Sequence, residues 1–465
     1  MIRRVSLQIL LERWVWTGST LTMRDSGTID ITTSCRSYNY TRSIGNPVAT
    51  CSLVMVAQRK DQNIMDYINV MDVIKVLEWG TVKFIGYITA VGYIGEIGDD
   101  GKANRAASIS CESFGGLLVN RSIGVNLGAI INKADVLVQA SLELVAAISD
   151  KLKDNTLPYA QAIQTVLSNF YDVLTKSGGT LFETYLNRYL DYQTGMIAKQ
   201  TSGVPKQFTF YTGSEEALTL YNILFQIVQA PFNELWLDNG PRTVQIEGNT
   251  VQLPGAKEYL IFRPTPFDGI VGGYDSSAFS HMSSKRIDRP YLRKFDLAKD
   301  GAEAYSLFIV VPSAYDASNL LLTTLGQAKY DSALINKYLL KTMKVQLYYT
   351  SVNSSTSTAP ADGASDLDSI SGDYAETLYN WFKLNDRYLK GNVTYHVPAD
   401  PSLDIRIGDK IEISGMTGYF YAEAVTHSWN YGGPMTGIAK VTRGWNYAGN
   451  TDITLTDKLF RRSVV

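Results

Sequence analysis

The stretch DIRIGDKIEISGMTGYFYAEAVTHSWNYGGPMTGIAKVTRG, from Asp404 to Gly444, indicates the fold more directly than any other part of the chain. Apolar and polar residues alternate along it, and glycine-rich turns divide it at short intervals. This alternation is typical of strands that bury one face, and short strands joined by tight turns are typical of a small β-barrel or sandwich. The stretch holds no catalytic constellation, so it favours a structural part over an enzyme.

The N-terminal residues 1–122 carry the same kind of pattern. Asp72–Ile88 is expected to form two strands around Glu78-Trp79-Gly80, and Tyr87–Glu112 a hairpin with its tip at Gly98–Gly101. With Thr28–Tyr40 and Ala49–Gln58 they make a series of short strands at close spacing. Such a series predicts a first β-barrel over residues 1–122.

In the middle of the chain, the spacing of apolar residues changes from strand-like alternation to a helical period. Leu127–Lys153 and Tyr159–Lys176 place apolar residues at helical spacing, and a third helix is expected at Leu181–Tyr192. We therefore expect a helical insert over 123–205 and a mixed α+β domain over 206–285. Strands of that domain are expected at Glu234–Asp238, Arg242–Ile246 and Tyr259–Phe262.

The remaining segments complete a fold of the α+β class that is mainly β. We expect a second barrel from residues 286–312 joined with 373–450, with an insertion over 313–372 between the two pieces. That insertion contains the Ser/Thr/Ala/Asp-rich stretch Ser351–Gly372, which is a flexible loop by composition. Residues 451–465 form a C-terminal tail.

The composition excludes several classes of protein. The net charge is −2, from 43 basic and 45 acidic residues, so the basic excess of a nucleic-acid-binding protein is missing, although DNA could slide past such a surface without sticking. The three cysteines, Cys35, Cys51 and Cys111, form no CxxC pair, and there are only three histidines, which argues against a zinc site. A Cys35–Cys51 bridge across a hairpin is one interpretation, but free thiols in a reducing compartment are favoured.

Targeting signals are not expected either. In MIRRVSLQILLERWVW, Glu12 and Arg13 interrupt the apolar run too early for a signal peptide. The most apolar helical stretch, Ala134–Ile148, is too short to span a bilayer. We expect a soluble protein that is not secreted.

Two loops resemble ligand-binding motifs but depart from them. Gly95–Lys102 has the wrong spacing for a phosphate-binding loop and lacks Ser or Thr after Lys102. Asp362–Asp373 has the length of an EF-hand loop, but Leu367 and Asp373 stand where that loop needs Gly and a bidentate Glu. We expect no metal and no cofactor.

One pair of residues permits a catalytic interpretation. Glu423 and His427 are expected on one face of a strand, where they could act as a general acid and base. The alternative is an interface or a lumen-facing stripe, with His427 hydrogen-bonded to its neighbours. No nucleophile motif lies nearby, so the structural interpretation is favoured and no catalytic residue is expected.

The C-terminal stretch carries a family resemblance. Asp404-Ile405-Arg406-Ile407-Gly408-Asp409, Val425-Thr426-His427, Tyr431-Gly432-Gly433 and Val441-Thr442-Arg443-Gly444 resemble the end of bacteriophage tail baseplate hub proteins, the central hub family of contractile-tail phages and tail-like particles. A second match resembles the middle signature of that family. It runs from Ala230–Leu235 to Tyr259–Phe262 and on through Arg263, Pro264, Thr265, Pro266, Phe267 and Asp268.

The resemblance also includes Ile68–Leu77 and Phe84–Ile88, although the turn Val70-Met71-Asp72 departs from the family pattern. The helical insert lies outside it. Under the resemblance, Arg263–Asp268 is an architectural corner, and Asp404, Gly408 and Asp409 set the turn into a strand. The remaining signature residues are expected to be structural: His427, Gly432, Gly433, Arg443 and Gly444.

The resemblance implies a homotrimer at the tip of a phage tail or tail-like injection particle. Each chain would carry two tube-type barrels, so three chains would make a ring of six similar units with heterologous interfaces and strands paired across subunits. The ring would join the sixfold tail tube to the threefold spike and let DNA or cargo pass without specific binding. Other implied partners are the tape-measure protein and further baseplate proteins. The implied location is the virion baseplate, assembled in the bacterial host cytoplasm.

Two alternatives stay open at this point. A cell-wall hydrolase carried on the tail tip is the first, although no pair of carboxylates stands out in the sequence as a glycosidase site. A receptor- or carbohydrate-binding module is the second, and it rests only on the 29 tyrosines and seven tryptophans.

Overall fold

The computed structural model describes the chain in segments. They are residues 6–17, 20–23, 28–56, 68–97, 103–120, 188–191, 221, 233–246, 249–267, 279, 282–312, 328–347, 372, 375–376 and 378–456. These residues form a mainly β fold, as predicted. The helices predicted within residues 127–187, the flexible loop before Gly372 and the hairpin tip at Gly98–Gly101 lie outside the described residues.

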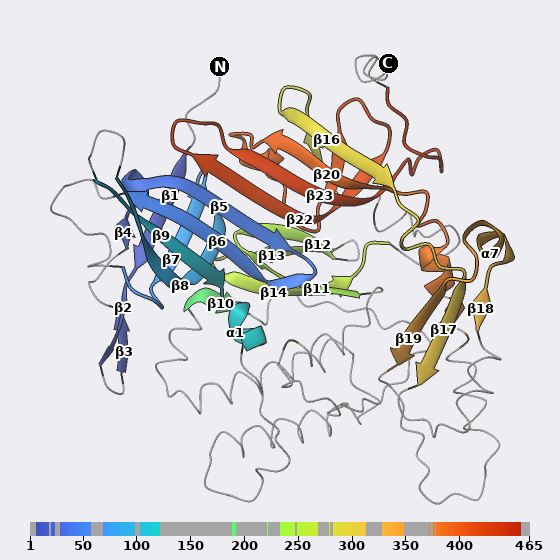
Figure 1. The fold of residues 1–465 in the computed structure, drawn as a ribbon, viewed down its shortest axis with the longest axis horizontal. Coiled ribbons are helices and arrows are strands. Elements are labelled where there is room, and N and C mark those ends of the chain that lie inside the picture. The colour runs from blue at the N-terminus through green and yellow to red at the C-terminus, as the bar shows by residue number, and fades with distance from the viewer. Residues whose placement is uncertain are drawn as a thin grey trace, which may run out of the picture.

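One curved sheet of 13 strands dominates the fold (Figure 1). Seven strands come from the N-terminal part of the chain: β1 (Leu7–Glu12), β4 (Ile29–Asp30), β5 (Cys35–Ser43), β6 (Asn46–Val56), β7 (Val73–Glu78), β8 (Thr81–Ile97) and β9 (Ala103–Ser113). Six come from the C-terminal part: β15 (Ser284–Ile287), β16 (Leu292–Lys299), β20 (Leu389–His396), β21 (Lys410–Ile413), β22 (Tyr419–Asn430) and β23 (Thr436–Trp445).

The two halves of this sheet meet where β22 pairs with β5. The sheet runs in the order β16-β20-β23-β22-β5-β6-β9-β8-β7-β1-β4, with β21 and β15 attached beside β22. Seven antiparallel residue pairs join β22 to β5, from Ala424↔Ser43 to Asn430↔Ser37. Most described strands of both predicted barrels therefore belong to one continuous sheet, whereas the division into two barrels remains a prediction.

Period-two alternation explains how the sheet buries its core. Along β5, the side chains of Tyr38, Tyr40 and Arg42 are buried, whereas those between them are exposed or half-buried. The three cysteines are buried as free thiols, and Cys51 on β6 lies opposite Cys111 on β9. Burial raises the pKa of the Cys51 thiol well above its ordinary value, so this thiol stays protonated.

The middle of the chain packs against the C-terminal half of the sheet. Trp236, Tyr259 and Ile261 share one hydrophobic cluster with Ile407 and Val393. The strands of this middle part form two small sheets, β10-β14-β11 and β12-β13. Their bounds are β10 (Leu190–Asp191), β11 (Asn233–Asn239), β12 (Arg242–Ile246), β13 (Asn249–Leu253) and β14 (Glu258–Pro264). The residues predicted to end the third helix, Leu190 and Asp191, are thus a strand.

A third, peripheral group lies at one end of the molecule (Figure 1). Its sheet, β18-β17-β19, packs Phe308 against Leu378 and Trp381. Its elements are β17 (Leu307–Pro312), β18 (Lys329–Tyr330), α7 (Ser332–Tyr338) and β19 (Thr342–Leu347). Thus β17, at the end of the predicted barrel segment 286–312, pairs outside the main sheet. The other described elements are β2 (Trp14–Thr17), β3 (Thr20–Met23) and α1 (Gly116–Asn120).

Candidate functional site

Charged side chains gather inside the molecule where the N-terminal strands, the middle strands and the 404–409 loop meet. We call this set the junction network, and it contains equal numbers of bases and acids. Its members are Arg42, Lys83, Arg242, Arg406, Asp238, Glu258, Asp404 and Asp409. Buried charges cost several kcal/mol each to desolvate, so close pairing is what makes such a set tolerable.

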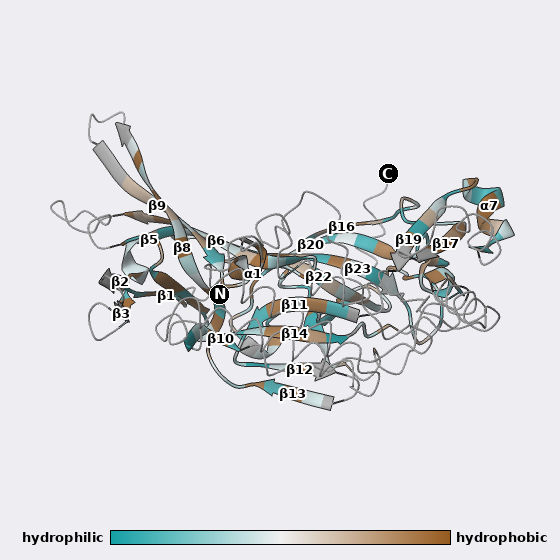
Figure 2. Cartoon of the chain, turned by 90° about the horizontal axis from the view of Figure 1, so that it is seen from below, coloured by the Kyte–Doolittle hydropathy of each residue, from teal (hydrophilic) through white to brown (hydrophobic). Residues whose placement is uncertain are grey.

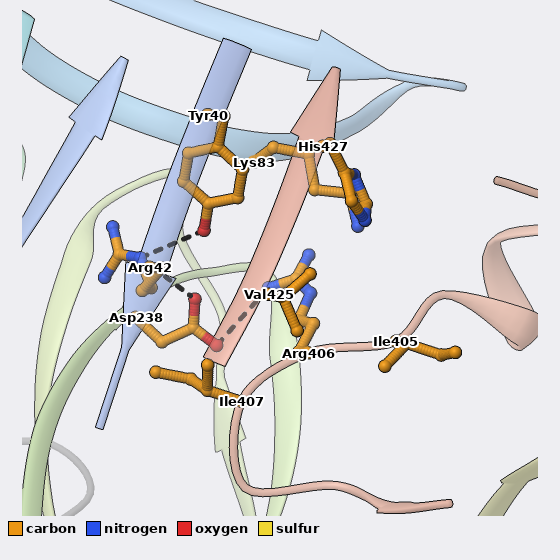
Figure 3. A pocket seen from close by; sticks show the side chains of 9 residues that line it. All are labelled: Tyr40, Arg42, Lys83, Asp238, Ile405, Arg406, Ile407, Val425 and His427. Carbon is orange, nitrogen blue, oxygen red and sulfur yellow. Dashed lines mark hydrogen bonds and ion pairs between the residues drawn. The ribbon is translucent and has the colours of Figure 1, made fainter. Parts of the chain in front are cut away.

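Asp238 on β11 lies at the centre of the junction network. It forms a close ion pair with Arg242, and its carboxylate oxygens lie 3.9 Å from both Arg42 and Arg406. Burial acts to raise the pKa of Asp238, but Arg242, Arg406 and Arg42 outweigh it and hold that pKa below its ordinary value. Figure 3 shows Arg42 and Arg406 approaching this carboxylate from two sides. Asp238 therefore stays ionised and holds three segments together.

Arg42 ties the N-terminal half of the sheet to β14. Its Nη2 lies 3.0 Å from Glu258 Oε1, and its Nε donates a hydrogen bond to the Tyr40 hydroxyl at 3.1 Å. The other Glu258 oxygen accepts a hydrogen bond from the backbone N–H of Gly115 at 3.1 Å. Because all these groups are buried, the contacts form in a low dielectric, where each is stronger than at the surface.

The 404–409 loop contributes the third side of the junction network. The backbone N–H of Arg406 donates to Asp409 at 2.9 Å, and its Nε donates to Asp404 at 2.9 Å. Lys83 on β8 also contacts Asp404. Gly408, with φ of 77°, makes the left-handed turn that the loop requires. Asp404, Gly408 and Asp409 thus lie in a turn, and the two carboxylates also pair with cations of the protein itself.

Lys83 is the lysine of the junction network, and its pKa is lowered. Burial and the neighbouring Arg406 lower the pKa of Lys83 to about 7, although several carboxylates oppose the shift. A small cavity of about 10 Å³ is lined by Lys83, Arg42, Asp238 and His427, among others, and this is about the room that one water molecule needs. A cavity of this size excludes an organic substrate.

His427 does not pair with Glu423. A β-bulge between Ala422 and Ala424 turns Glu423 outward, where its carboxylate lies 3.2 Å from Lys440. His427 is buried, and its Nδ1 lies 2.7 Å from Glu78 Oε2 on β7. Its Nε2 lies 3.2 Å from the Tyr395 hydroxyl. The general acid–base pairing considered from the sequence is therefore wrong, and His427 takes the hydrogen-bonded position that the structural interpretation expected.

Arg263 forms a second buried cluster next to the junction network. Its Nε lies 2.7 Å from Glu234 Oε1, and its Nη2 donates hydrogen bonds to the Gly408 carbonyl and the Tyr421 hydroxyl, each at 3.0 Å. The guanidinium also lies 4.6 Å from the centre of the Trp236 ring. Arg263 is therefore more than part of a corner, because it joins β14, β11 and β22 through one side chain.

The other signature residues have structural surroundings. β14 continues through Pro264, so the chain leaves the strand at Thr265 and Pro266, and the buried Phe267 packs edge-on against Tyr421. Asp268 lies outside the described residues.

Arg443 stacks on Trp381, with 4.0 Å from its guanidinium carbon to the ring centre, and on Phe267 at 4.9 Å. Gly432 and Gly433 make the turn between β22 and β23, and a Cβ on Gly444 would overlap the Phe420 ring.

Two other kinds of feature were sought among the described residues, a metal-binding group and a membrane-spanning helix. They contain no group of three or more His, Cys, Asp or Glu side chains placed to hold a metal ion. Within the same residues, no helix combines the length and the apolar character needed to cross a bilayer. What the buried clusters do is join segments that are far apart in the sequence.

Several residues of this site were not singled out in the sequence. They are Arg42, Lys83, Glu78, Glu234, Asp238 and Glu258. For Arg42 a signal exists, because it falls two and four residues after Tyr40 and Tyr38 on the inward face of an alternating strand. For Asp238 and Glu258 the partners come from other strands, so no local pattern marks them.

The comparisons with known proteins give structural similarity only. No family model and no curated protein matches the sequence. The 43 kDa tail protein of prophage MuSo2 from Shewanella oneidensis is 12% identical, covers 94% of this chain and 98% of its own, and has a TM-score of 0.47. A tail protein from Neisseria meningitidis is 10% identical over 96% of this chain and 99% of its own, with a TM-score of 0.46.

The prophage tail protein gp18 from Listeria monocytogenes is 8% identical over 93% of this chain and 94% of its own, with a TM-score of 0.41. All three of these similar structures are of phage tail proteins.

Proposed function

We propose that this chain is a structural hub protein of a phage tail baseplate or of a related injection particle. Three copies would form a ring with pseudo-sixfold symmetry, which joins the sixfold tail tube to the threefold spike. DNA or cargo would pass through the ring without specific binding. The tape-measure protein and other baseplate proteins would be neighbours, and assembly would take place in the host cytoplasm.

The observation that carries this proposal is the junction between β22 and β5. It merges strands from both ends of the chain into one sheet, and the junction network locks that sheet to the middle strands. A protein that transmits force between a tube and a spike has to be rigid. If the two halves of its sheet were joined by a flexible hinge, they would move relative to each other instead of transmitting the force. The signature residues Arg263, Asp409 and His427 all take part in this locking.

The buried chemistry also fits a role without catalysis. Glu78, His427 and Tyr395 form a hydrogen-bonded row of buried side chains, and of these three only His427 lines the cavity, which has room for about one water molecule. A general acid or base has to reach the proton that it transfers, and these three side chains are almost completely buried. The row therefore supports a role in stability.

Native mass spectrometry of the purified chain and of purified particles tests the proposal. A single chain has a mass of 51.5 kDa, so the ring predicts a species of three times that mass and the presence of the chain in particles. A purely monomeric mass, together with absence from particles, would refute the hub function. Loss of turbidity of purified peptidoglycan on addition of the protein would favour a hydrolase instead.

A further inference from the structure

Two adjacent leucines are exposed in the turn between α7 and β19. Leu339 is 78% exposed and Leu340 is 65% exposed, and we call this pair the leucine tip. Tyr330, also 65% exposed, lies at the same end of the small sheet, because Tyr330 on β18 and Thr342 on β19 pair with opposite sides of Leu307 on β17. One exposed apolar residue needs no explanation, but several at one end of a sheet are typical of an interaction site.

The backbone of Leu339 makes its exposure more informative. Leu339 follows α7 with φ of 62° and ψ of −168°, a conformation that is found almost only at glycine. Glycine at this position would keep the path of the chain without strain, and it would remove an exposed apolar side chain. The fold is therefore better served by glycine, and the leucine side chain indicates a contact with another molecule.

Ser306 holds the leucine tip in this conformation. Its side chain is buried, and its hydroxyl donates a hydrogen bond to the Leu339 carbonyl at 2.8 Å and accepts one from the backbone N–H of Lys341 at 2.9 Å. The backbone N–H of Ser306 donates to the Lys341 carbonyl at 2.9 Å. The backbone N–H of Leu339 donates to the Ile335 carbonyl at 2.8 Å. A turn that is fixed before binding loses little conformational entropy when a partner covers it.

The charges beside the leucine tip favour an acidic partner. Residues 328–347 carry four lysines and one aspartate. The side chain of Lys337, two residues before the tip, is 59% exposed, whereas that of its partner Asp386 is only 7% exposed. The carboxylate of Asp331 is turned to its own helix, since it accepts hydrogen bonds from backbone N–H groups at the start of α7. The charge that this surface presents to solvent is therefore positive.

A protein fits the leucine tip better than a lipid bilayer does. A single myristoyl chain binds a membrane only marginally, and the two leucine side chains together contain fewer apolar carbons than that chain. An apolar pocket in a protein can enclose both side chains and place carboxylates beside Lys337, so that the contact is specific as well as apolar. Figure 2 shows α7, β17 and β19 at one end of the molecule, away from β5 and β6. A partner can therefore cover the tip without contact with the β22–β5 junction.

We propose that the leucine tip is a docking site for a different protein of the particle, one that receives Leu339 and Leu340 in an apolar pocket bordered by carboxylates. The inference rests on the proposed function and deepens it, because it names the surface and the chemistry of one contact with a neighbour that is not another copy of this chain.

Leu339→Gly tests whether the leucine serves a contact. Relief of the backbone strain should raise the melting temperature of the isolated chain by about 1–3 °C. Loss of the side chain should lower the titre of infective or cell-killing particles at least tenfold. Val70→Gly is the control, because Val70 is also exposed in a turn but has no positive φ, and it should neither raise the melting temperature nor lower the titre. An unchanged titre for Leu339→Gly would overturn the inference.

Two substitutions of Leu340 test the charge of the partner. Both remove the apolar side chain, but Leu340→Asp adds an anion that an acidic pocket rim repels, whereas Leu340→Lys adds a cation that it attracts. The particle titre should therefore fall further for Leu340→Asp than for Leu340→Lys. The reverse order would contradict an acidic partner.

Cysteine labelling tests whether the tip is covered in the particle. Leu340→Cys should react with a maleimide in the isolated chain, and at least tenfold more slowly in purified particles. The unaltered chain gives the background, because Cys35, Cys51 and Cys111 are buried. Equal reaction in the two samples would overturn the inference. Protection that is already complete in the isolated, assembled chain would assign the tip to another copy and would overturn it as well.

Vesicles of phosphatidylethanolamine and phosphatidylglycerol test the lipid alternative. The unaltered chain should not co-sediment with them, and co-sedimentation that is lost in Leu340→Asp would overturn the inference in favour of a membrane.

The labelling also separates the inference from the proposed function. A chain that is present in particles but whose Leu340→Cys variant reacts freely there would refute the docking site and leave the hub function standing. Absence of the unaltered chain from purified particles would refute the hub function itself.

Discussion

His427 on β22 and Glu78 on β7 are hydrogen-bonded across the sheet, with 2.7 Å between Nδ1 and Oε2, although 349 positions separate them in the sequence. Their side chains are 1% and 0% exposed. Burial acts to raise the pKa of Glu78, but His427 and Lys83 outweigh it and keep that pKa below its ordinary value. This pair therefore couples the two halves of the sheet through a buried carboxylate that stays ionised.

Removal of either partner should be strongly destabilising. Glu78→Ala or His427→Ala leaves the other group buried without its partner, which costs about 3–5 kcal/mol of the free energy of unfolding. The double variant should lose less than the sum of the two. Urea denaturation measures all three values. The control is the exposed pair Glu423–Lys440 on neighbouring strands, whose removal should cost about 0–1 kcal/mol. Additive losses below 1 kcal/mol at Glu78 and His427 would contradict the coupling.

Arg263 should not tolerate replacement by lysine. Lysine keeps the charge but cannot donate to Glu234, Gly408 and Tyr421 together, because it lacks the planar fork of donors. Arg263→Lys should lower the free energy of unfolding by about 2–4 kcal/mol, in the range for a broken buried network.

Arg286→Lys is the matched control. Arg286 also pairs with a carboxylate, Asp288 at 2.8 Å, but its side chain is about half exposed. The control should change the free energy of unfolding by less than about 0.5 kcal/mol. Equal effects of the two substitutions would show that the planar guanidinium of Arg263 is not needed for stability.

Gly408 and Gly432 separate crowding from backbone conformation. Both have positive φ, 77° and 81°, so alanine at either position costs about 1–2 kcal/mol for the left-handed conformation. A Cβ at Gly408 would also come within 3.0 Å of Arg263 Nη2 and 3.2 Å of the Trp236 ring, whereas nothing lies within 4 Å at Gly432. Thermal melting should therefore show a larger loss for Gly408→Ala than for Gly432→Ala. A larger loss for Gly432→Ala would contradict the close packing of Gly408 against Arg263 and Trp236.

Asp238 makes the stability depend on acid pH. Because its pKa is lower in the folded chain, the unfolded chain binds a proton first as the pH falls through the ordinary value of 3.8. The contribution of Asp238 is therefore present above that pH and lost below it. Urea midpoints between pH 6 and pH 3 should fall less steeply for Asp238→Asn than for the unaltered chain. Asp296→Asn, at an exposed site, should keep the original slope.

The strands were predictable from the sequence because their signals are local. The turn at Glu78-Trp79-Gly80 divides β7 from β8 as predicted, and β12 has the predicted bounds, Arg242–Ile246. The pairing of β22 with β5 was not predictable, since two strands about 380 residues apart have no local signal for each other.

In the candidate site, too, only the features with local sequence signals were predictable. The family resemblance implied a turn at Asp404, Gly408 and Asp409, and glycine and aspartate are typical turn residues. It placed Glu423 and His427 on one face because period two assumes an unbroken strand, and the bulge at Glu423 shifts that period. The acidic partners Glu78 and Glu234 come from distant strands, so only the folded chain reveals them.

A cryo-EM map of the intact particle tests the central claim most directly. The account predicts three copies of this chain in one ring directly below the tail tube, with six similar units and with the β22–β5 junction intact in every copy. A map that places the chain as single copies away from the tube axis, or a particle that lacks the chain, would contradict it.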